Sequence, residues 1–348
     1  MTTPYKKIGQ HTAVLSHPPT AVGFASVAGK REGEGPMHRY FDIINPDTTF
    51  GQKTWEKAES QMQKQAVQHA LQKAGFAADQ LDYLFAGDLL NQCISSTYGL
   101  RDLGVPMAGL FGACSTMAEG LALSSMIIDG GFAHRTAAVT SSHFCTAERQ
   151  FRMPLEYGGQ RPPTAQWTVT GSGCVVLCAQ GEGPYVVECT LGRIIDLGVT
   201  DANDMGSAMA PSACDTLCQY FRDTGKKPAD FDFIATGDLG CIGKEIVTEC
   251  MAQEGYDMTG VYDDCGCMIY DPKTQDVGSG GSGCGCSAVV LTGYILPRLQ
   301  KHIWHDVLFI GTGALMSPTA CQQGESIPGI AHLVHLTDHL SMGTGIQQ

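Results

Sequence analysis

The sequence predicts an α/β fold made of two related halves, and two observations carry that prediction. Helix-like and strand-like segments alternate along the 348 residues, which is typical of a mostly parallel sheet with helices on its faces. A repeat also runs through the chain: Gly75 recurs as Gly225, and Gly87-Asp88-Leu89 recurs as Gly237-Asp238-Leu239. We therefore divide the chain into residues 1–182 and residues 183–348. In such folds we expect the ligand site beyond the carboxyl ends of the strands.

The first repeated unit is a helix followed by a strand. Apolar residues recur at helical spacing between residues 52 and 74, and Gly75 supplies a C-terminal stop. The apolar run at residues 81–92 then predicts a buried strand that ends in a polar loop. In the second half the equivalent helix ends at Gly225, and the equivalent strand covers residues 231–240.

A Gly-rich turn, a helix and a buried strand complete each half. In the first half the turn and helix span residues 112–131, and the strand follows at 135–143. In the second half the matching segments are 281–299 and 306–314. The similarity is looser here, but the order of elements is the same in both halves.

Composition excludes some classes of function. The net charge is −13 and Lys and Arg form no block, which argues against a nucleic-acid partner and against long-range attraction of an anionic ligand. No run reaches the ~18 apolar residues that span a bilayer, and the polar start lacks the apolar core of a signal peptide. We expect a cytoplasmic or peripherally membrane-associated protein with no bound cofactor.

Fifteen cysteines without an export signal indicate reduced thiols rather than a disulfide framework. Two C-x-C pairs could in principle supply four thiolates to zinc, but the usual spacing is C-x₂₋₄-C, so we expect no metal site. The four residues are Cys265, Cys267, Cys284 and Cys286.

Cys114 is the candidate centre of the site, because it stands at the start of an apolar helix. Unpaired backbone N–H groups and the helix dipole can lower the pKa of such a thiol, and they can also hold a negative group of a ligand. With Ser115 beside it, this helix start suits either a nucleophile or an anion. The alternative is a buried cysteine that only packs.

Two further polar side chains could reach the same cleft. His143 follows the strand at 136–142 and could pair with Cys114 or donate to a carboxylate. Arg161 offers a guanidinium group, the natural partner of a carboxylate. A structural histidine, and surface ion pairs with Glu148 or Glu156, are the alternatives.

Loop residues complete the candidate set. Asp88 and Asn91 follow the first repeated strand, where they could contact a ligand or simply form a turn. Gly281 and Gly283 lie in the Gly-rich run 278–287, which could bring backbone N–H groups close to a ligand. The run lacks the Lys-Ser/Thr ending of a phosphate-binding loop, so a tight turn is the alternative.

The repeat and the motif "GACST" resemble the thiolase superfamily, whose condensing enzymes place their acyl-accepting cysteine at this helix start. Longer segments resemble the stage V sporulation protein AD family within it: "AGDLLNQ", "LFGACSTM", "SSHFCTAERQFRMPLEYGGQ", "GRIIDLGVTDANDMGSAMAP" and "GSGGSGCGCSAVV". The resemblance implies a five-layered α-β-α-β-α thiolase fold and a homodimer. It also implies a role in moving dipicolinic acid into the developing endospore, at the spore inner membrane, with membrane proteins of the stage V sporulation A operon as partners.

The chain departs from the condensing enzymes at two positions. Those enzymes need a histidine after the first strand of the second half, where this chain has Gly237-Asp238-Leu239. Their asparagine or histidine in the later Gly-rich turn is also absent from residues 278–287. Without these groups a condensation lacks oxyanion donors, each worth about 10² to 10³ in rate.

Three hypotheses follow. In the first, a non-catalytic pocket binds dipicolinic acid, possibly as its neutral 1:1 calcium chelate, with one carboxylate at Cys114 and Ser115 and the other near His143 and Arg161. In the second, the chain is an acyltransferase of the 3-ketoacyl synthase III type that uses Cys114 with His143. In the third, it is a scaffold for membrane partners with an empty pocket.

Overall fold

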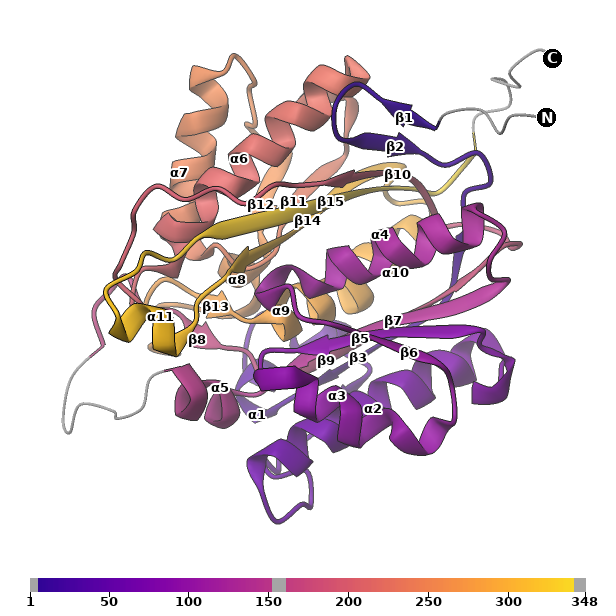
Figure 1. Ribbon diagram of the computed structural model, residues 1–348, viewed down its shortest axis with the longest axis horizontal. Coiled ribbons are helices and arrows are strands. Elements are labelled where there is room, and N and C mark those ends of the chain that lie inside the picture. The colour runs from indigo at the N-terminus through magenta and orange to yellow at the C-terminus, as the bar shows by residue number, and fades with distance from the viewer. Residues whose placement is uncertain (1–5, 152–160, 341–348) are drawn as a thin grey trace.

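Five layers make up the molecule, with helices outside and between two sheets (Figure 1). The structure is a computed structural model that describes residues 6–151 and 161–340. The outer helices are α2 (Trp55–Ala74) and α3 (Ile94–Leu100) on one side, and α6 (Met205–Thr224) and α7 (Gly240–Gln253) on the other. The middle layer holds α4 (Thr116–Asp129), α9 (Cys284–Val290) and α10 (Leu296–Gln300). This architecture confirms the predicted five-layered thiolase fold.

Among the described residues, ten of the thirteen strands of the large sheet form one path, five from each half in the same order, and β1 (Lys7–Ile8), β2 (Thr12–Val14) and β4 (Ile43–Ile44) lie off this path. The first half has β3 (Thr20–Ala28), β9 (Gly171–Cys178), β7 (Arg135–Ser142), β5 (Tyr83–Asp88) and β6 (Met107–Leu110). The second has β10 (Tyr185–Leu191), β15 (Gly329–Thr337), β14 (Asp306–Ala314), β11 (Phe233–Thr236) and β12 (Tyr262–Asp264). The two sets join through one residue pair, Tyr185 and Thr20. The connection between β9 and β10 contains residue 182, at which we divided the sequence.

The sheet is mixed, which corrects the expectation of a mostly parallel one. In each half two strand pairs are parallel, but the last strand, β9 or β15, runs antiparallel to both of its neighbours. The reason is the connection: β15 follows β14 through a loop and one short helix rather than a full crossover helix. Strands buried on both faces read as apolar runs whatever their direction, so the sequence does not reveal this reversal.

The helices α2 and α6 form as the repeat predicts. Thr54 and Asp204 cap their N-termini by accepting hydrogen bonds from the backbone N–H of Lys57 and Ser207. Gly75 and Gly225 end them in the left-handed conformation, both with a φ of 72°. A residue with a β-carbon is strained at such a position, which confirms the predicted stops.

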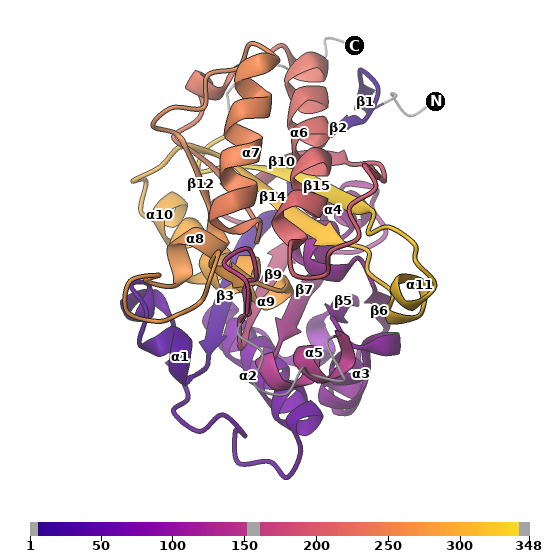
Figure 2. The ribbon, with the colours of Figure 1, turned by 90° about the vertical axis from the view of Figure 1, so that its left-hand side faces the viewer.

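The ends of several elements meet at one side of the molecule. The carboxyl ends of β11 and β14 and the start of α9 come together there, because Asp238, directly after β11, accepts hydrogen bonds from Gly283 and Thr312. Figure 2 shows this side, with β5, β7, α5 (Phe144–Phe151) and α9 near the middle of the view. Short elements cover this side: α5, α11 (Pro318–Gln322), and the paired strands β8 (Trp167–Thr168) and β13 (Gly281–Ser282). Within the described ranges, no helix has the length and apolar character needed to cross a membrane.

Candidate functional site

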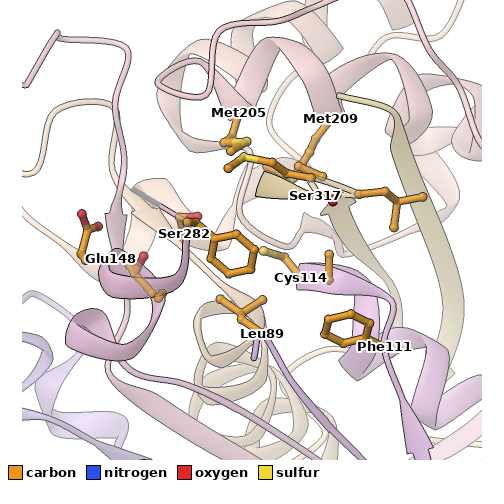
Figure 3. Close-up of a pocket in the computed structure, with 15 residues that line it drawn as sticks. Leu89, Phe111, Cys114, Glu148, Met205, Met209, Ser282 and Ser317 are labelled. Carbon is orange, nitrogen blue, oxygen red and sulfur yellow. The ribbon is translucent and has the colours of Figure 1, made fainter. Parts of the chain in front are cut away.

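A cavity of about 290 Å³ lies beside Cys114, between the two halves (Figure 3). Most of its lining is apolar and includes Leu89, Phe111, Phe151, Met205 and Met209. The polar lining side chains are Glu148, Thr168, Ser282 and Ser317. A mostly apolar cavity with a few polar groups is the usual form of a small-molecule site.

Cys114 stands where a tight turn becomes α4. Ala113 adopts a φ of +52°, and Ser115 closes the turn by donating its hydroxyl hydrogen to the Gly112 carbonyl at 2.6 Å. This geometry places the 9% exposed Cys114 on the cavity wall, as the sequence predicts. Ser115 is fully buried and does not line the cavity, so the structure does not bring its hydroxyl to a ligand.

Asp238 is the polar partner of Cys114. Its fully buried carboxylate lies near enough for its charge to act on the Cys114 thiol, and it accepts hydrogen bonds from the Gly283 N–H at 2.7 Å and from the Thr312 hydroxyl at 2.8 Å. Burial raises the pKa of Cys114 well above its usual value, and the negative charge of Asp238 raises it further. The expectation that the helix start lowers this pKa is therefore wrong, because these two effects exceed that of the dipole.

Sequence reasoning left Asp238 out of the site, although a signal was present. The repeat places it at the position of Asp88, directly after the equivalent strand. It is also the position where the resemblance implies a histidine if the chain is to act as a condensing enzyme. A carboxylate stands there instead, and its charge acts on the thiol.

His143 is held away from Cys114. Its ring is buried, with Nε2 2.8 Å from the Thr48 carbonyl and Nδ1 accepting the Cys145 N–H at 3.1 Å. These two bonds use both ring nitrogens and fix a neutral tautomer that donates from Nε2. Burial lowers the pKa of His143. This corrects the expectation that His143 pairs with Cys114.

Arg161 reaches the site only through Glu148. Its guanidinium group lies 2.6 Å from a Glu148 carboxylate oxygen and donates to the Gln166 carbonyl at 3.0 Å. It also lies over the rings of Phe144 and Trp167. The ion pair with Glu148 that we weighed as the alternative is present, whereas Glu156 lies outside the described residues.

Asp88 and Asn91 occupy different places. Asp88 is fully buried and accepts hydrogen bonds from the N–H groups of Leu90 and Ser96 and from the Ser96 hydroxyl. The structure therefore assigns Asp88 to the loop that leads into α3, not to the cavity. Asn91 is exposed and borders a second hollow, which shares Phe111 with the cavity.

The two glycines shape the cavity wall without facing the ligand space. The Gly281 carbonyl accepts a hydrogen bond from the Gln166 side chain at 2.8 Å. Gly283 has a φ of +99°, and its N–H is already donated to Asp238. Ser282 between them lines the cavity, so the Gly-rich run does approach it, but through a side chain that we had not singled out.

The cysteines of the two C-x-C pairs do not converge on a common point. Cys267 lies 3.0 Å from Cys241, measured between sulfurs. The Cys284 thiol donates to the Ser141 carbonyl instead. All fifteen cysteines are free.

Comparison with known proteins finds one family that matches most of the chain. The family model described as stage V sporulation protein AD matches residues 9–337. Stage V sporulation protein AD of Bacillus subtilis (strain 168) is 47% identical over 327 residues, which cover 94% of this chain and 96% of the relative.

Solved structures of condensing enzymes share the fold. The 3-oxoacyl-[acyl-carrier-protein] synthase III of Aquifex aeolicus VF5 has a TM-score of 0.57 at 11% identity, over 92% of this chain and 99% of that one. Cerulenin-bound OleA of Xanthomonas campestris has a TM-score of 0.61 at 12% identity, over 93% and 99%. At these identities the similarity shows the fold alone.

Proposed function

Because the chain belongs to the stage V sporulation protein AD family, we propose that its cavity binds dipicolinic acid, a flat pyridine dicarboxylate, and performs no catalysis on it. The observation that carries the proposal is a mostly apolar cavity whose lining cysteine, Cys114, has a buried carboxylate, Asp238, as its charged neighbour. In this proposal the cavity of the fold remains available to a ligand, whereas the cysteine no longer serves as a nucleophile. Homodimerisation and association with the membrane proteins of the operon stay predictions of the family resemblance.

The shape and lining of the cavity suit an aromatic ring. Phe111 and Phe151 both line the cavity that Cys114 lines, so they can pack against a flat heterocycle. The hydroxyl groups of Thr168 and Ser317 can donate hydrogen bonds to carboxylate oxygens, whereas the Ser282 hydroxyl donates to Asp238 at 3.5 Å. Ring packing and oriented hydroxyl donors together favour a small aromatic acid over a long acyl chain.

Charge favours the calcium chelate over the free dianion. Among the described lining residues there is no lysine, arginine or histidine, and the carboxylate of Glu148 is paired with Arg161. A free dianion would lose its hydration without gaining a cation in return. The 1:1 calcium complex is neutral and avoids this cost. Calcium is then part of the cargo and needs no protein ligand set of its own.

The state of Cys114 argues against the acyltransferase hypothesis. Acyl transfer requires the thiolate, and the Asp238 charge opposes its formation in a buried site. His143, the proposed base, is bonded to backbone groups elsewhere. An acyl-CoA incubation followed by intact-mass measurement should therefore give no adduct. An adduct that disappears in Cys114→Ser would support the enzyme instead.

Calorimetric titration tests the proposal directly. We expect dipicolinate with equimolar calcium to bind more tightly than dipicolinate alone. Phe111→Ala should weaken binding about tenfold, corresponding to about 1.4 kcal/mol of lost ring packing. Phe132→Ala is the matched control, because Phe132 is also exposed but lies beyond the other end of α4. Failure of both forms of dipicolinate to bind the wild-type chain would exclude the proposal.

A further inference from the structure

Three imidazoles surround one buried carboxylate at the opposite end of β14 from the cavity. Asp338, whose side chain is 4% exposed, follows β15. One of its oxygens lies 2.7 Å from Nδ1 of His339. The other lies 2.8 Å from Nδ1 of His302 and 2.9 Å from Nδ1 of His305. The potential ligand atoms of His305, Asp338 and His339 all lie within 4.8 Å of one another.

The antiparallel pairing of β14 and β15 builds this cluster. Asp306, the first residue of β14, stands opposite Thr337, the last residue of β15. The residues just before β14 therefore face those just after β15, and the Asp338 N–H donates to the His305 carbonyl at 3.1 Å. His302 lies in the turn after α10, with a φ of +54°. The cluster thus ties that turn to the C-terminal end of β15.

The composition of the cluster suits a transition-metal ion. Neutral imidazole nitrogen with one carboxylate oxygen is a ligand set for zinc and similar ions, whereas calcium prefers oxygen ligands alone. Three imidazole nitrogens point at the two oxygens of Asp338 from 2.7 to 2.9 Å, so the potential ligand atoms already face one another. Asp232 lies close by and accepts the N–H of His305 at 2.6 Å, which adds negative charge.

We propose that His305, Asp338 and His339 form a zinc-binding site on the protein surface, with His302 beside it as a further hydrogen-bond partner of Asp338. The metal would take the place of the protons that the imidazoles of His305 and His339 now share with Asp338, with the carboxylate as the buried ligand. The cysteine spacing predicts no metal site, and this cluster contains no cysteine. β14 spans nine residues, so the site is roughly 26 Å from the strand end at the cavity. It is therefore independent of the proposed calcium dipicolinate cavity.

Calorimetry with zinc chloride tests the site in the full-length chain. We expect one zinc ion per chain at this site and no heat change with calcium chloride. The double variant His305→Asn/His339→Asn should weaken zinc binding at least about tenfold. His17→Asn is the matched control, because His17 is an exposed histidine 3.5 Å from the carboxylate of Asp129. Zinc should also raise the Tm of the wild type and not that of the double variant.

Cobalt chloride separates histidine from cysteine ligands. The wild-type spectrum should show visible d–d bands without a thiolate-to-cobalt charge-transfer band. A charge-transfer band that is lost in Cys241→Ser would place the metal at the thiols and overturn the proposal. So would a zinc isotherm that is the same in the double variant and the wild type. If the double variant is unfolded at the assay temperature, Asp338→Asn serves as the second variant for the same comparison.

Discussion

The charge of Asp238 acts on the Cys114 thiol, and this single pair separates the site from the cysteine–histidine arrangement that a condensing enzyme would need here. An imidazole beside a thiol can accept its proton and leave a stabilised thiolate, whereas a buried carboxylate repels the thiolate. Asp238 is held in turn by Gly283 and Thr312, so its orientation is fixed from two elements. The residue is thus built to keep the thiol protonated.

Alkylation rates should report this difference. Cys241 is half-buried, and a hydrogen bond from Cys267, together with the charge of Lys244, lowers its pKa to about 7. At pH 7.5 iodoacetamide should therefore label Cys241 at least about tenfold faster than Cys145, which is also half-buried but has a raised pKa. Cys114 should react more slowly than either. Peptide mapping by mass spectrometry measures the three rates.

The variant Asp238→Asn provides the internal comparison. Removing the negative charge lowers the pKa of Cys114, so its labelling should accelerate while the Cys241 rate stays unchanged. Labelling of wild-type Cys114 as fast as Cys241 would contradict the role given to Asp238.

At the residue scale, the sequence predicts where a residue lies in the fold better than it predicts which groups its side chain contacts. The motif around Cys114 predicts that this thiol lies at a helix start on a cavity, because that depends on neighbouring residues. The direction of the His143 ring depends instead on Thr48, almost a hundred residues earlier in the chain. The cluster around Asp338 joins residues that lie more than thirty positions apart. Contacts of this kind follow from the strand register, which a single sequence does not provide.

At the scale of elements, the start of α9 depends on Gly283. Its backbone lies at a φ of +99°, and a β-carbon there would come within 2.6 Å of the Ser142 hydroxyl oxygen. That hydroxyl cannot easily move, because it donates to the Val169 carbonyl and accepts the Gly285 N–H. The turn, the strand β7 and the Asp238 carboxylate are thereby linked.

Substitution of Gly283 by alanine should therefore be costly. We expect Gly283→Ala to lower the free energy of unfolding by roughly 3 kcal/mol, from backbone strain and the clash with Ser142 together. Gly131→Ala should cost only about 1 kcal/mol, since Gly131 has a φ of +78° but open space around it. Urea denaturation of both variants gives the comparison. Equal losses of unfolding free energy in the two variants would mean that the Ser142 hydroxyl moves aside without a measurable effect, and would contradict this prediction.

The helices of the repeat were predictable and the strand directions were not. α2 and α6 have one buried face, so their apolar spacing and terminal glycines appear in the sequence. The strands β9 and β15 lie in the middle of their sheets and are buried on both faces. Their apolar runs carry no signal for parallel or antiparallel pairing.

At the scale of the whole molecule, the interior between α2 and the sheet contains buried acids. Glu59 is fully buried and accepts hydrogen bonds from the hydroxyls of Ser141 and Thr146. Burial, with the nearby charge of Asp88, raises the pKa of Glu59 to about 8 from an ordinary value of 4.5. The folded protein thus holds a proton there that the unfolded chain releases at lower pH.

This proton makes stability depend on pH in a defined direction. Because the folded-state pKa is raised, the contribution of Glu59 is fully present below pH 4.5 and is lost as the pH rises toward 8. The slope approaches about 1.4 kcal/mol per pH unit for one proton. Glu59→Gln keeps the shape of the side chain and removes its titration, so the free energy of unfolding, measured by urea denaturation between pH 5 and 8, should vary less with pH than in the wild type.

Glu182→Gln, at an exposed position, should leave the slope unchanged. If wild type and Glu59→Gln lost stability in parallel over this range, the proton would reside on another group, and Asp264, whose pKa burial raises to about 7, would be the next residue to substitute.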